Sequence, residues 1–598
     1  MYKYFLFFIL SISLAYSNAI LIDMIKKDKL LEDNINFIDI NITNKTKNII
    51  SSKDNFFLSY HLYSLDNKLI KFDNTRTKIN ILANNTQNIK LKLAPLKAGK
   101  YILEIDILKE KKYWLKLNYR LELQIDSYFG DYQECNRKFK RTCWYIDGED
   151  SINRLWFIIA RVLKFSQKRL KKFNISGFSA GSIYLSQIWI RDSYTILTYS
   201  KYLYKEPFLS SWLFYMLDNI KNNGLIYDWF DSSGHFDKNT VESDQESSLA
   251  LAYFELLEID RDRYINRLDD IERLLSNLWR LKRDKSSGLI VNAHTIDWGD
   301  VQYGATNWKD AVYFNNNSFK VVGIYTNAIF YSAIEKLLKE YKKLDKKKYL
   351  KWKNIQNRLK IDINSYLWNK ERGFYRIHKH VSYLKHPFDE DNIFAMGGNS
   401  VALSTSLVDK NKIKSIINTA LKREKLFNIS TISGVLLPPY PRNYYKYHIV
   451  DDYFEYQNGG QWDWFGARLL KIMFLNNFEK VGLDELRKIA QKIVKNRTIS
   501  EWNDTLGNHR GSSNYAGAGG VLGNAIVEGL FGIKLRDGKI YIDRVPKMNK
   551  KFLLNLYIPQ NNLHIFYRYD GKCFLLNSNK VDKIELNIDN ICFKVGKI

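Results

Sequence analysis

Hydrophobic and polar residues alternate along residues 25–130, in short segments that turn signals separate. Examples are NIKLKL and KYILEIDIL. A period of two places every second side chain on the same face of a strand. The pattern therefore predicts antiparallel strands throughout residues 25–130, arranged as a small β-sandwich.

The period changes in residues 150–531. Apolar residues recur at three- and four-residue spacing in segments such as ESSLALAYFELLEI and TNAIFYSAIEKLLKEY. This spacing is typical of amphipathic helices, and about twelve are expected here. Long polar loops, rich in glycine and aromatic residues, follow alternate helices, whereas simple bundles have short loops throughout. We therefore expect helical hairpins that close into a ring.

The pattern returns to alternation in residues 532–598, in segments such as GKIYIDRV and NLHIFYRY. These segments predict a small C-terminal β-domain. The expected fold class is thus a multidomain, mainly α protein with a β-domain on each side of the helices. A chain of 598 residues is also too long for one hydrophobic core.

The first 19 residues, MYKYFLFFILSISLAYSNA, combine one lysine, an apolar run and a small-x-small ending. This pattern is typical of a cleaved signal peptide; an uncleaved anchor is the alternative. We expect an exported protein (periplasmic, cell-surface or secreted) without stable membrane insertion after cleavage. The four cysteines form two local pairs, Cys135 with Cys143 and Cys573 with Cys592. In an oxidising compartment each pair would form a disulfide; buried free thiols are the alternative.

The formal net charge is +28, but the lysines are spread along the whole chain and no nucleic-acid-binding motif is present. Abundant Lys, Asn, Ile and Tyr together indicate a genome rich in A and T, and a dedicated acidic partner is the alternative interpretation. Aromatic residues reach 15%, and such rings can build cores or stack against sugar rings. No metal-binding spacing and no phosphate-binding glycine loop occurs, so we expect neither metal nor cofactor.

Candidate chemistry is concentrated in the long loops. The stretch HTIDWGDVQYG holds Asp297, Trp298 and Asp300 beside glycines. QIWIRDSYT places an arginine–aspartate pair at a helix start, where the acid could cap the helix or the pair could bind sugar hydroxyls. VESDQESS is either a solvated acidic helix start or a substrate contact. YQNGGQWDW combines two glycines with two tryptophans, and ISEWNDT supplies Glu501 on a distant hairpin.

These motifs, in this order, resemble those of the six-hairpin (α/α)6 glycosidases, which include glucoamylases, trehalases, glycogen-debranching glucosidases and alkaline/neutral invertases. WIRDSYT resembles their Arg-Asp substrate motif, and YQNGGQW their Asn-Gly-Gly-x-Trp loop. IDWGDV and ISEWNDT fall where those families carry the general acid and the general base. Separately, YHLYSLDNKLIKFDNTRTKI and APLKAGKYILEIDILKEKKYWLK resemble a small Ig-like β-sandwich of bacterial carbohydrate-related proteins.

The resemblance implies inverting hydrolysis of an oligo- or polysaccharide, with Asp300 as the general acid and Glu501 as the general base. A closed pocket would imply exo-action, the release of a monosaccharide or small saccharide. We expect burial to raise the pKa of the acid, and the base to stay ionised and more exposed to water. Glucoamylases use a glutamate as the acid, so Asp244, Glu246 and Asp297 are alternatives for that role. The expected substrate contacts are Trp189, Arg191, Asp192, Asp244, Glu246, Asp297, Trp298, Asn458, Trp462 and Trp464.

Two other classes remain open at this stage. A non-catalytic carbohydrate-binding protein could share the fold and the aromatic residues, although the presence of both carboxylates favours an enzyme. A polysaccharide lyase would need a tyrosine or histidine base, and the chain has nine histidines, none obviously paired with a tyrosine. A nucleic-acid-binding protein is the least favoured class.

Overall fold

The computed structural model describes residues 19–26, 30, 36–125, 135, 140–445, 453–588 and 591–598. All but the last residue of the expected signal peptide lies outside them. The chain forms two compact units, Met1–Asp131 and Tyr132–Ile598. None of the helices within the described ranges combines the length and the apolar character needed to cross a membrane.

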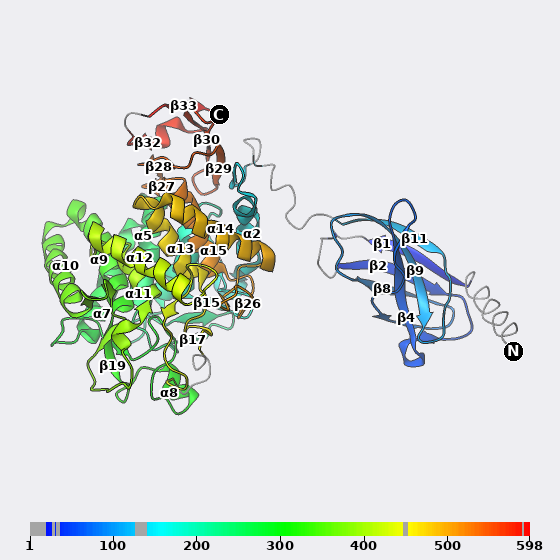
Figure 1. The fold of residues 1–598 in the computed structure, drawn as a ribbon, viewed down its shortest axis with the longest axis horizontal. Coiled ribbons are helices and arrows are strands. Elements are labelled where there is room, and N and C mark those ends of the chain that lie inside the picture. The colour runs from blue at the N-terminus through cyan, green and yellow to red at the C-terminus, as the bar shows by residue number, and fades with distance from the viewer. Residues whose placement is uncertain are drawn as a thin grey trace. The chain divides into compact units, whose positions relative to one another are not determined.

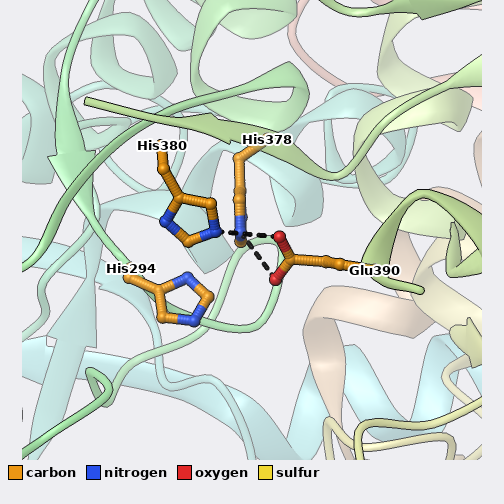
Figure 2. A group of neighbouring side chains, drawn as sticks. All are labelled: His294, His378, His380 and Glu390. Carbon is orange, nitrogen blue, oxygen red and sulfur yellow. Dashed lines mark hydrogen bonds and ion pairs between the residues drawn. The ribbon is translucent and has the colours of Figure 1, made fainter. Parts of the chain in front are cut away.

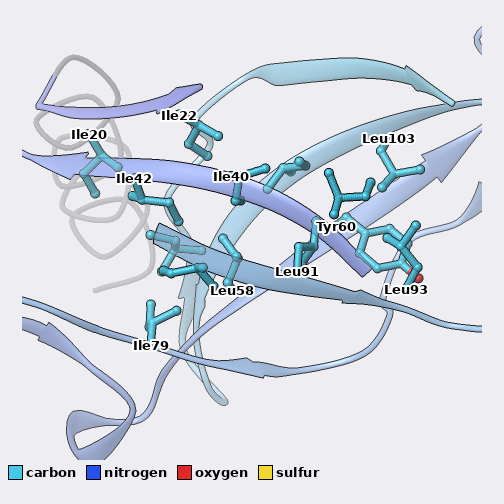
Figure 3. Packing of buried hydrophobic residues seen from close by; sticks show 14 of the residues in the cluster. Ile20, Ile22, Ile40, Ile42, Leu58, Tyr60, Ile79, Leu91, Leu93 and Leu103 are labelled. Atoms are coloured by element: carbon cyan, nitrogen blue, oxygen red, sulfur yellow. The ribbon is translucent and has the colours of Figure 1, made fainter. Parts of the chain in front are cut away.

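The described part of the N-terminal unit consists mainly of strands, with one short helix, η1 (Ser52–Asp54). The strands are β1 (Ile20–Lys26), β2 (Asn36–Asn44), β3 (Ile50–Ser51), β4 (Phe56–Tyr63), β5 (Leu69–Lys71), β6 (Thr77–Lys78), β7 (Asn80–Ile81), β8 (Asn85–Leu93), β9 (Gly99–Lys109), β10 (Tyr113–Trp114) and β11 (Tyr119–Ile125). The sheet β1-β2-β8 and the sheet built around β4 and β9 are antiparallel and share one core. In β2, Ile38, Ile40 and Ile42 are fully buried, whereas Phe37 is 50% exposed. Figure 3 shows Ile40 and Ile42 in this core, with Leu58 and Leu91.

The second unit contains the helices (Figure 1). They are α2 (Asp150–Ser166), α3 (Ile190–Ser200), α4 (Ser211–Asp218), α5 (Gln245–Ile259), α6 (Arg261–Tyr264), α7 (Leu268–Lys282), α8 (Trp308–Val312), α9 (Ile324–Leu344), α10 (Lys346–Tyr366), α11 (Met396–Ala402), α12 (Lys410–Leu426), α13 (Asp463–Leu475), α14 (Glu479–Asn496) and α15 (Ala516–Asn524).

Six of these helices contact one another in a cycle. Helix α3 contacts α5, α5 contacts α9, α9 contacts α11, α11 contacts α13, α13 contacts α15, and α15 contacts α3. Helix α5 of this cycle is buried along nearly its whole length, on all its faces. Helix α15 approaches α3 so closely that a Cβ at Gly520 would collide with the Thr195 carbonyl, which explains its glycine-rich sequence.

Other helices pack outside this cycle with one apolar face. Helix α7 buries Leu268, Ile271, Leu275 and Leu278 at three- and four-residue intervals and carries charged residues elsewhere. Helix α7 contacts α5, α10 contacts α9, and α2 contacts both α14 and α15. The pairing of a buried helix with an amphipathic one positions the connecting loops, and the loops carry the candidate site.

Short strands in those loops are β13 (Gln167–Leu170), β14 (Ile175–Phe178), β15 (Gln187–Trp189), β16 (Trp229–Asp231), β17 (Phe236–Asp237), β18 (Asn292–Ala293), β19 (Lys320–Gly323), β20 (Trp368–Asn369), β21 (Phe374–Tyr375), β22 (His378–His380), β23 (Phe394–Ala395), β24 (Leu436–Leu437), β25 (Trp502–Asn503) and β26 (His509–Arg510). Each belongs to a sheet of two or three strands. Such small sheets fix loop backbone without adding a layer to the fold.

The C-terminal strands are β27 (Ile533–Arg536), β28 (Lys539–Ile542), β29 (Phe552–Ile558), β30 (Leu563–Tyr569), β31 (Phe574–Ser578), β32 (Ile584–Leu586) and β33 (Phe593–Lys597). One further strand, β12 (Cys143–Ile146), pairs with β29, so a segment just ahead of α2 adds to the C-terminal sheet. Disulfides join Cys135 to Cys143 and Cys573 to Cys592. The first of them ties the start of β12 to the chain that precedes it.

Candidate active site

A cavity of about 260 Å³ lies among the loops of the helical unit. Its lining includes Asp300 and Glu501, which come from loops far apart in the sequence. Six of the expected substrate contacts line it as well: Trp189, Arg191, Asp192, Trp298, Trp462 and Trp464. The loops before α3, α9, α13 and α15 thus contribute to one space.

Glu501 lies just before β25 and is 4% exposed. Its Oε1 accepts hydrogen bonds from the hydroxyl groups of Tyr184 at 2.8 Å and Tyr456 at 3.4 Å. Its Oε2 accepts one from the backbone N–H of Ser512 at 2.8 Å. Burial raises the pKa of Glu501, the bonds from Ser512 and Tyr184 counteract this, and the nearby Asp300 carboxylate adds to the rise.

Asp300 is held by Arg191, whose Nη2 donates to its Oδ1 at 2.7 Å. The side chain of Asp300 is nevertheless 32% exposed. From the sequence we expected the acid to be buried and the base to be more exposed to water, but Glu501 is more buried than Asp300. The reason is that two tyrosines and the Ser512 loop cover Glu501, whereas Asp300 is held by the Arg191 guanidinium.

Arg191 occupies the first turn of α3 and is the charged centre of the site. Its Nη1 donates to the carbonyl of Trp298 at 3.0 Å and lies 3.6 Å from Asp244. Because one buried guanidinium contacts the backbone of residue 298 and the carboxylate of residue 300, it fixes the loop that carries the candidate acid. The neighbouring Asp192 accepts a hydrogen bond from the Tyr515 hydroxyl at 2.7 Å, and burial raises its pKa to about 6.

Four expected substrate contacts, Asp244, Glu246, Asp297 and Asn458, are not part of the cavity lining. Asp244 accepts a hydrogen bond from Tyr325 and faces Arg191 from behind the lining. Glu246 accepts from the backbone of Ile226, and the amide of Asn458 bonds the backbone of Tyr440. Asp297 accepts from the N–H of Gly398 at the start of α11. Each of these side chains binds loop backbone or a neighbouring charged group. The residue types alone could not distinguish this structural role from sugar binding.

Asp297 provides a test of this structural role. Burial raises its pKa from 3.8 to about 7, and the bonds from Gly398 and Gly397 only partly compensate. A carboxyl group that prefers the protonated form when folded lowers the free energy of unfolding as the pH rises from about 4 to about 7. Asp297→Asn removes this titration. Relative to wild type, the free energy of unfolding of the variant should therefore increase by ~2–4 kcal/mol across that pH interval, and its melting temperature should increase accordingly.

Melting temperatures of Asp297→Asn and wild type, compared at about pH 5 and about pH 8, measure this effect. Asp262→Asn, the same substitution at an exposed aspartate of α6, is the control. A constant difference for Asp297→Asn would contradict the assigned burial of the charge.

Several lining residues were not predicted from the sequence. They are Ala180, Tyr184, Asn239, Thr240, Val301, Trp308, Val312, Tyr456, Gln457 and Tyr515. Trp308 is 46% exposed, whereas Trp298, Trp462 and Trp464 are each 2% exposed or less and form the wall. Tyr456 and Gln457 lie in the YQNGGQW motif, so that motif could have indicated them. Tyr184 and Trp308 lie in segments with no distinguishing pattern.

Comparisons with known proteins give a likeness of fold. No family model matches the chain, and neither does any curated protein sequence. The GH78 family rhamnosidase of Bacillus sp. GL1 is similar in structure over 96% of this chain and 55% of its own, with a TM-score of 0.55 and 12% identity. The GH63 mannosylglycerate hydrolase from Thermus thermophilus, in complex with glucose, covers 61% of this chain and 98% of its own, with a TM-score of 0.48 and 14% identity.

Both neighbours are glycoside hydrolases. At 12% identity the similarity to the rhamnosidase shows the fold alone: a multidomain chain of helices and many sheets. The likeness to the mannosylglycerate hydrolase is too weak to add to this. What the chain does has to be argued from its own residues.

Proposed function

We propose that this protein is a glycoside hydrolase that acts on an oligo- or polysaccharide with inversion, using Asp300 as the general acid and Glu501 as the general base. The cycle of contacts through α3, α5, α9, α11, α13 and α15 supports an (α/α)6 barrel as its scaffold. The observation that carries the proposal is that both carboxylates line a single cavity together with aromatic side chains and a buried arginine.

Glycoside hydrolysis by inversion needs one carboxyl group to protonate the departing oxygen and another to deprotonate a water molecule on the opposite face of the sugar. Glu501 suits the second role, because two tyrosine hydroxyl groups and one N–H fix its oxygens. Asp300 suits the first, since its exposed oxygen can reach a substrate while Arg191 holds the other one. The aromatic faces of Trp189 and Trp308 supply apolar surface for sugar C–H groups.

The size of the cavity favours action at a chain end. Ligand pockets commonly have volumes of about 300–1,000 Å³, and 260 Å³ is close to the lower limit. The cavity is therefore suited to one terminal sugar residue with a leaving group. We also propose that the protein is exported, and the two disulfides support this because such bonds persist in oxidising compartments.

A panel of aryl glycosides and oligosaccharides tests the function. Wild type should cleave at least one member, and proton NMR of the first product should show the anomer opposite to that of the substrate. The double variant Asp300→Asn/Glu501→Gln should bind that substrate without cleaving it. Binding by wild type with no cleavage of any panel member would favour a carbohydrate-binding protein, and an unsaturated product that absorbs in the ultraviolet would reveal a lyase.

Tyr184→Phe should shift the pH profile of kcat/KM. The Tyr184 hydroxyl donates to the Glu501 carboxylate and so lowers its pKa against the effect of burial. A base must be deprotonated, so activity rises with pH through this pKa. Loss of one charge-assisted hydrogen bond should move the acidic limb upward by about one pH unit.

The matched control for Tyr184→Phe is Tyr313→Phe, since Tyr313 also donates to a carboxylate, that of Asp237, and neither residue belongs to the cavity lining. The control should keep the wild-type limb. If the acidic limb of Tyr184→Phe were unshifted, the group that titrates in this limb would not be Glu501.

A further inference from the structure

A second group of polar side chains lies outside the cavity lining and has no part in the proposed hydrolysis. It consists of His294, His378, His380 and Glu390, each of which offers one nitrogen or oxygen atom within 4.8 Å of those of the other three. Four of the chain's nine histidines meet here, because His386 also lies 2.8 Å from His380. Figure 2 shows the three imidazole rings and the carboxylate turned toward one another.

The local fold explains why residues so far apart in the sequence meet. Strand β19 pairs with β18 on one side and with β22 on the other. His294 follows β18 directly, and His378 and His380 begin and end β22, so the two-residue spacing places both on one face. Glu390 begins the short helix η4 (Glu390–Asn392) and reaches this face from the following loop.

The hydrogen bonds of the group leave nitrogen atoms without partners. Glu390 oxygens contact His378 Nε2 at 3.1 Å and His380 Nε2 at 2.9 Å. His294 is fully buried, and its Nε2 contacts the Tyr444 hydroxyl at 2.9 Å. The Nδ1 atoms of His294 and His380 are buried and have no hydrogen-bond partner. A buried polar atom without a partner is costly, so each such atom requires an explanation.

A bound cation would supply the missing partner of His294 Nδ1, while His380 would bind the ion through the Nε2 that already faces Glu390. Metal-ligating imidazoles usually hold their second nitrogen with a hydrogen bond, as the Tyr444 hydroxyl does for His294. Tyr440 likewise donates to Glu390 at 2.9 Å. Three imidazoles and one carboxylate suit zinc and similar transition metals, whereas calcium and magnesium prefer oxygen ligands alone. Ligand atoms around zinc lie about 3.3 Å apart, so small side-chain rotations would complete the site.

We propose that His294, His378, His380 and Glu390 bind one divalent transition-metal ion of the zinc class. Four protein ligands leave no open position, so the ion has a structural role. It joins β18, β22 and η4 where the loop that carries Trp298 and Asp300 begins. Asp300 lies six residues beyond His294. The site does not depend on the proposed hydrolysis, because none of its ligands lines the cavity.

Metal content of the full-length chain, without a histidine tag, tests the site directly. After treatment with a chelator and addition of Zn²⁺, wild type should retain about one equivalent through desalting. His378→Ala and Glu390→Gln should lose it, while the exposed His235→Ala should retain it. Wild type that retains no zinc, or ligand variants that retain as much as wild type, would overturn the proposal.

Two further measurements test the site even if the ligand variants fail to fold. Co²⁺ added to metal-free wild type should give the intense visible bands of tetrahedral cobalt, and all four cysteines are in disulfides, so thiolates cannot produce them. Tyr444→Phe should keep the ligands but weaken Zn²⁺ binding by about 10–100-fold. The absence of cobalt bands in folded wild type would refute the site whatever the variants do.

Discussion

Asp300→Asn should lower kcat/KM about 10²–10⁴-fold on glycosides with a poor leaving group, such as an alkyl glycoside or an oligosaccharide. The substitution removes the proton that the departing oxygen needs. It keeps the geometry, because an amide oxygen can still accept the hydrogen bond from Arg191 that the carboxylate accepts at 2.7 Å. On aryl glycosides with a strongly acidic phenol the loss should be much smaller, since such a leaving group departs without protonation.

The dependence of rate on the pKa of the leaving phenol, measured for wild type and Asp300→Asn, checks this expectation. The variant should show the steeper dependence. Asp262→Asn, at an exposed aspartate of α6, is the control and should behave as wild type. Equal losses on good and poor leaving groups would assign Asp300 to substrate binding or to loop structure instead of proton donation.

Local patterns predicted much of the secondary structure. Alternation in NIKLKL predicted β8, because a two-residue period in Ile89, Leu91 and Leu93 specifies a buried face with little dependence on the rest of the chain. Helix α7 was equally predictable from its three- and four-residue spacing. Pairing of β12 with β29 was not, because a four-residue strand has too short a pattern and its partner lies more than 400 residues away.

The candidate site, like the secondary structure, was predictable only in part. Motifs indicated the loops that meet at the cavity, but not which acid of IDWGD points into it. Asp297 has a left-handed backbone conformation, with φ of 50°. Its carboxylate accepts a hydrogen bond from the N–H of Gly398, which is distant in the sequence. Three positions later, Asp300 reaches the cavity. Long-range contacts decide such orientations, and a single sequence does not reveal them.

Burial of Glu501 and the histidine group escaped prediction for the same physical reason. Tyr184 covers Glu501 from a loop that precedes it by more than 300 residues. His294 and His378 are neighbours only because β19 lies between their strands. Metal-binding motifs with short spacing can be recognised in a sequence, whereas ligands on separate strands of a sheet cannot.

Glu501→Gln should lower kcat about 10²–10⁴-fold on every glycoside, irrespective of the leaving group. Activation of water is needed in each case, and an amide cannot accept the proton. Gln keeps an oxygen for the Tyr184 and Tyr456 hydroxyl groups, so the pocket should still bind substrate with nearly unchanged affinity. Burial raises the pKa of Glu501, and this pKa sets the acidic limb of the pH profile. The variant has no carboxylate at residue 501, so this limb should be absent from its profile.

Steady-state kinetics with two substrates of contrasting leaving groups measure this, with substrate affinity determined separately by calorimetry. Glu455→Gln, an exposed acid on the neighbouring loop, is the matched control and should retain wild-type rates. The contrast between the two acid variants is the decisive result: loss that depends on the leaving group in Asp300→Asn, and uniform loss in Glu501→Gln. The reverse pattern would exchange the two roles, and it would then be the buried carboxylate, whose pKa is raised, that donates the proton.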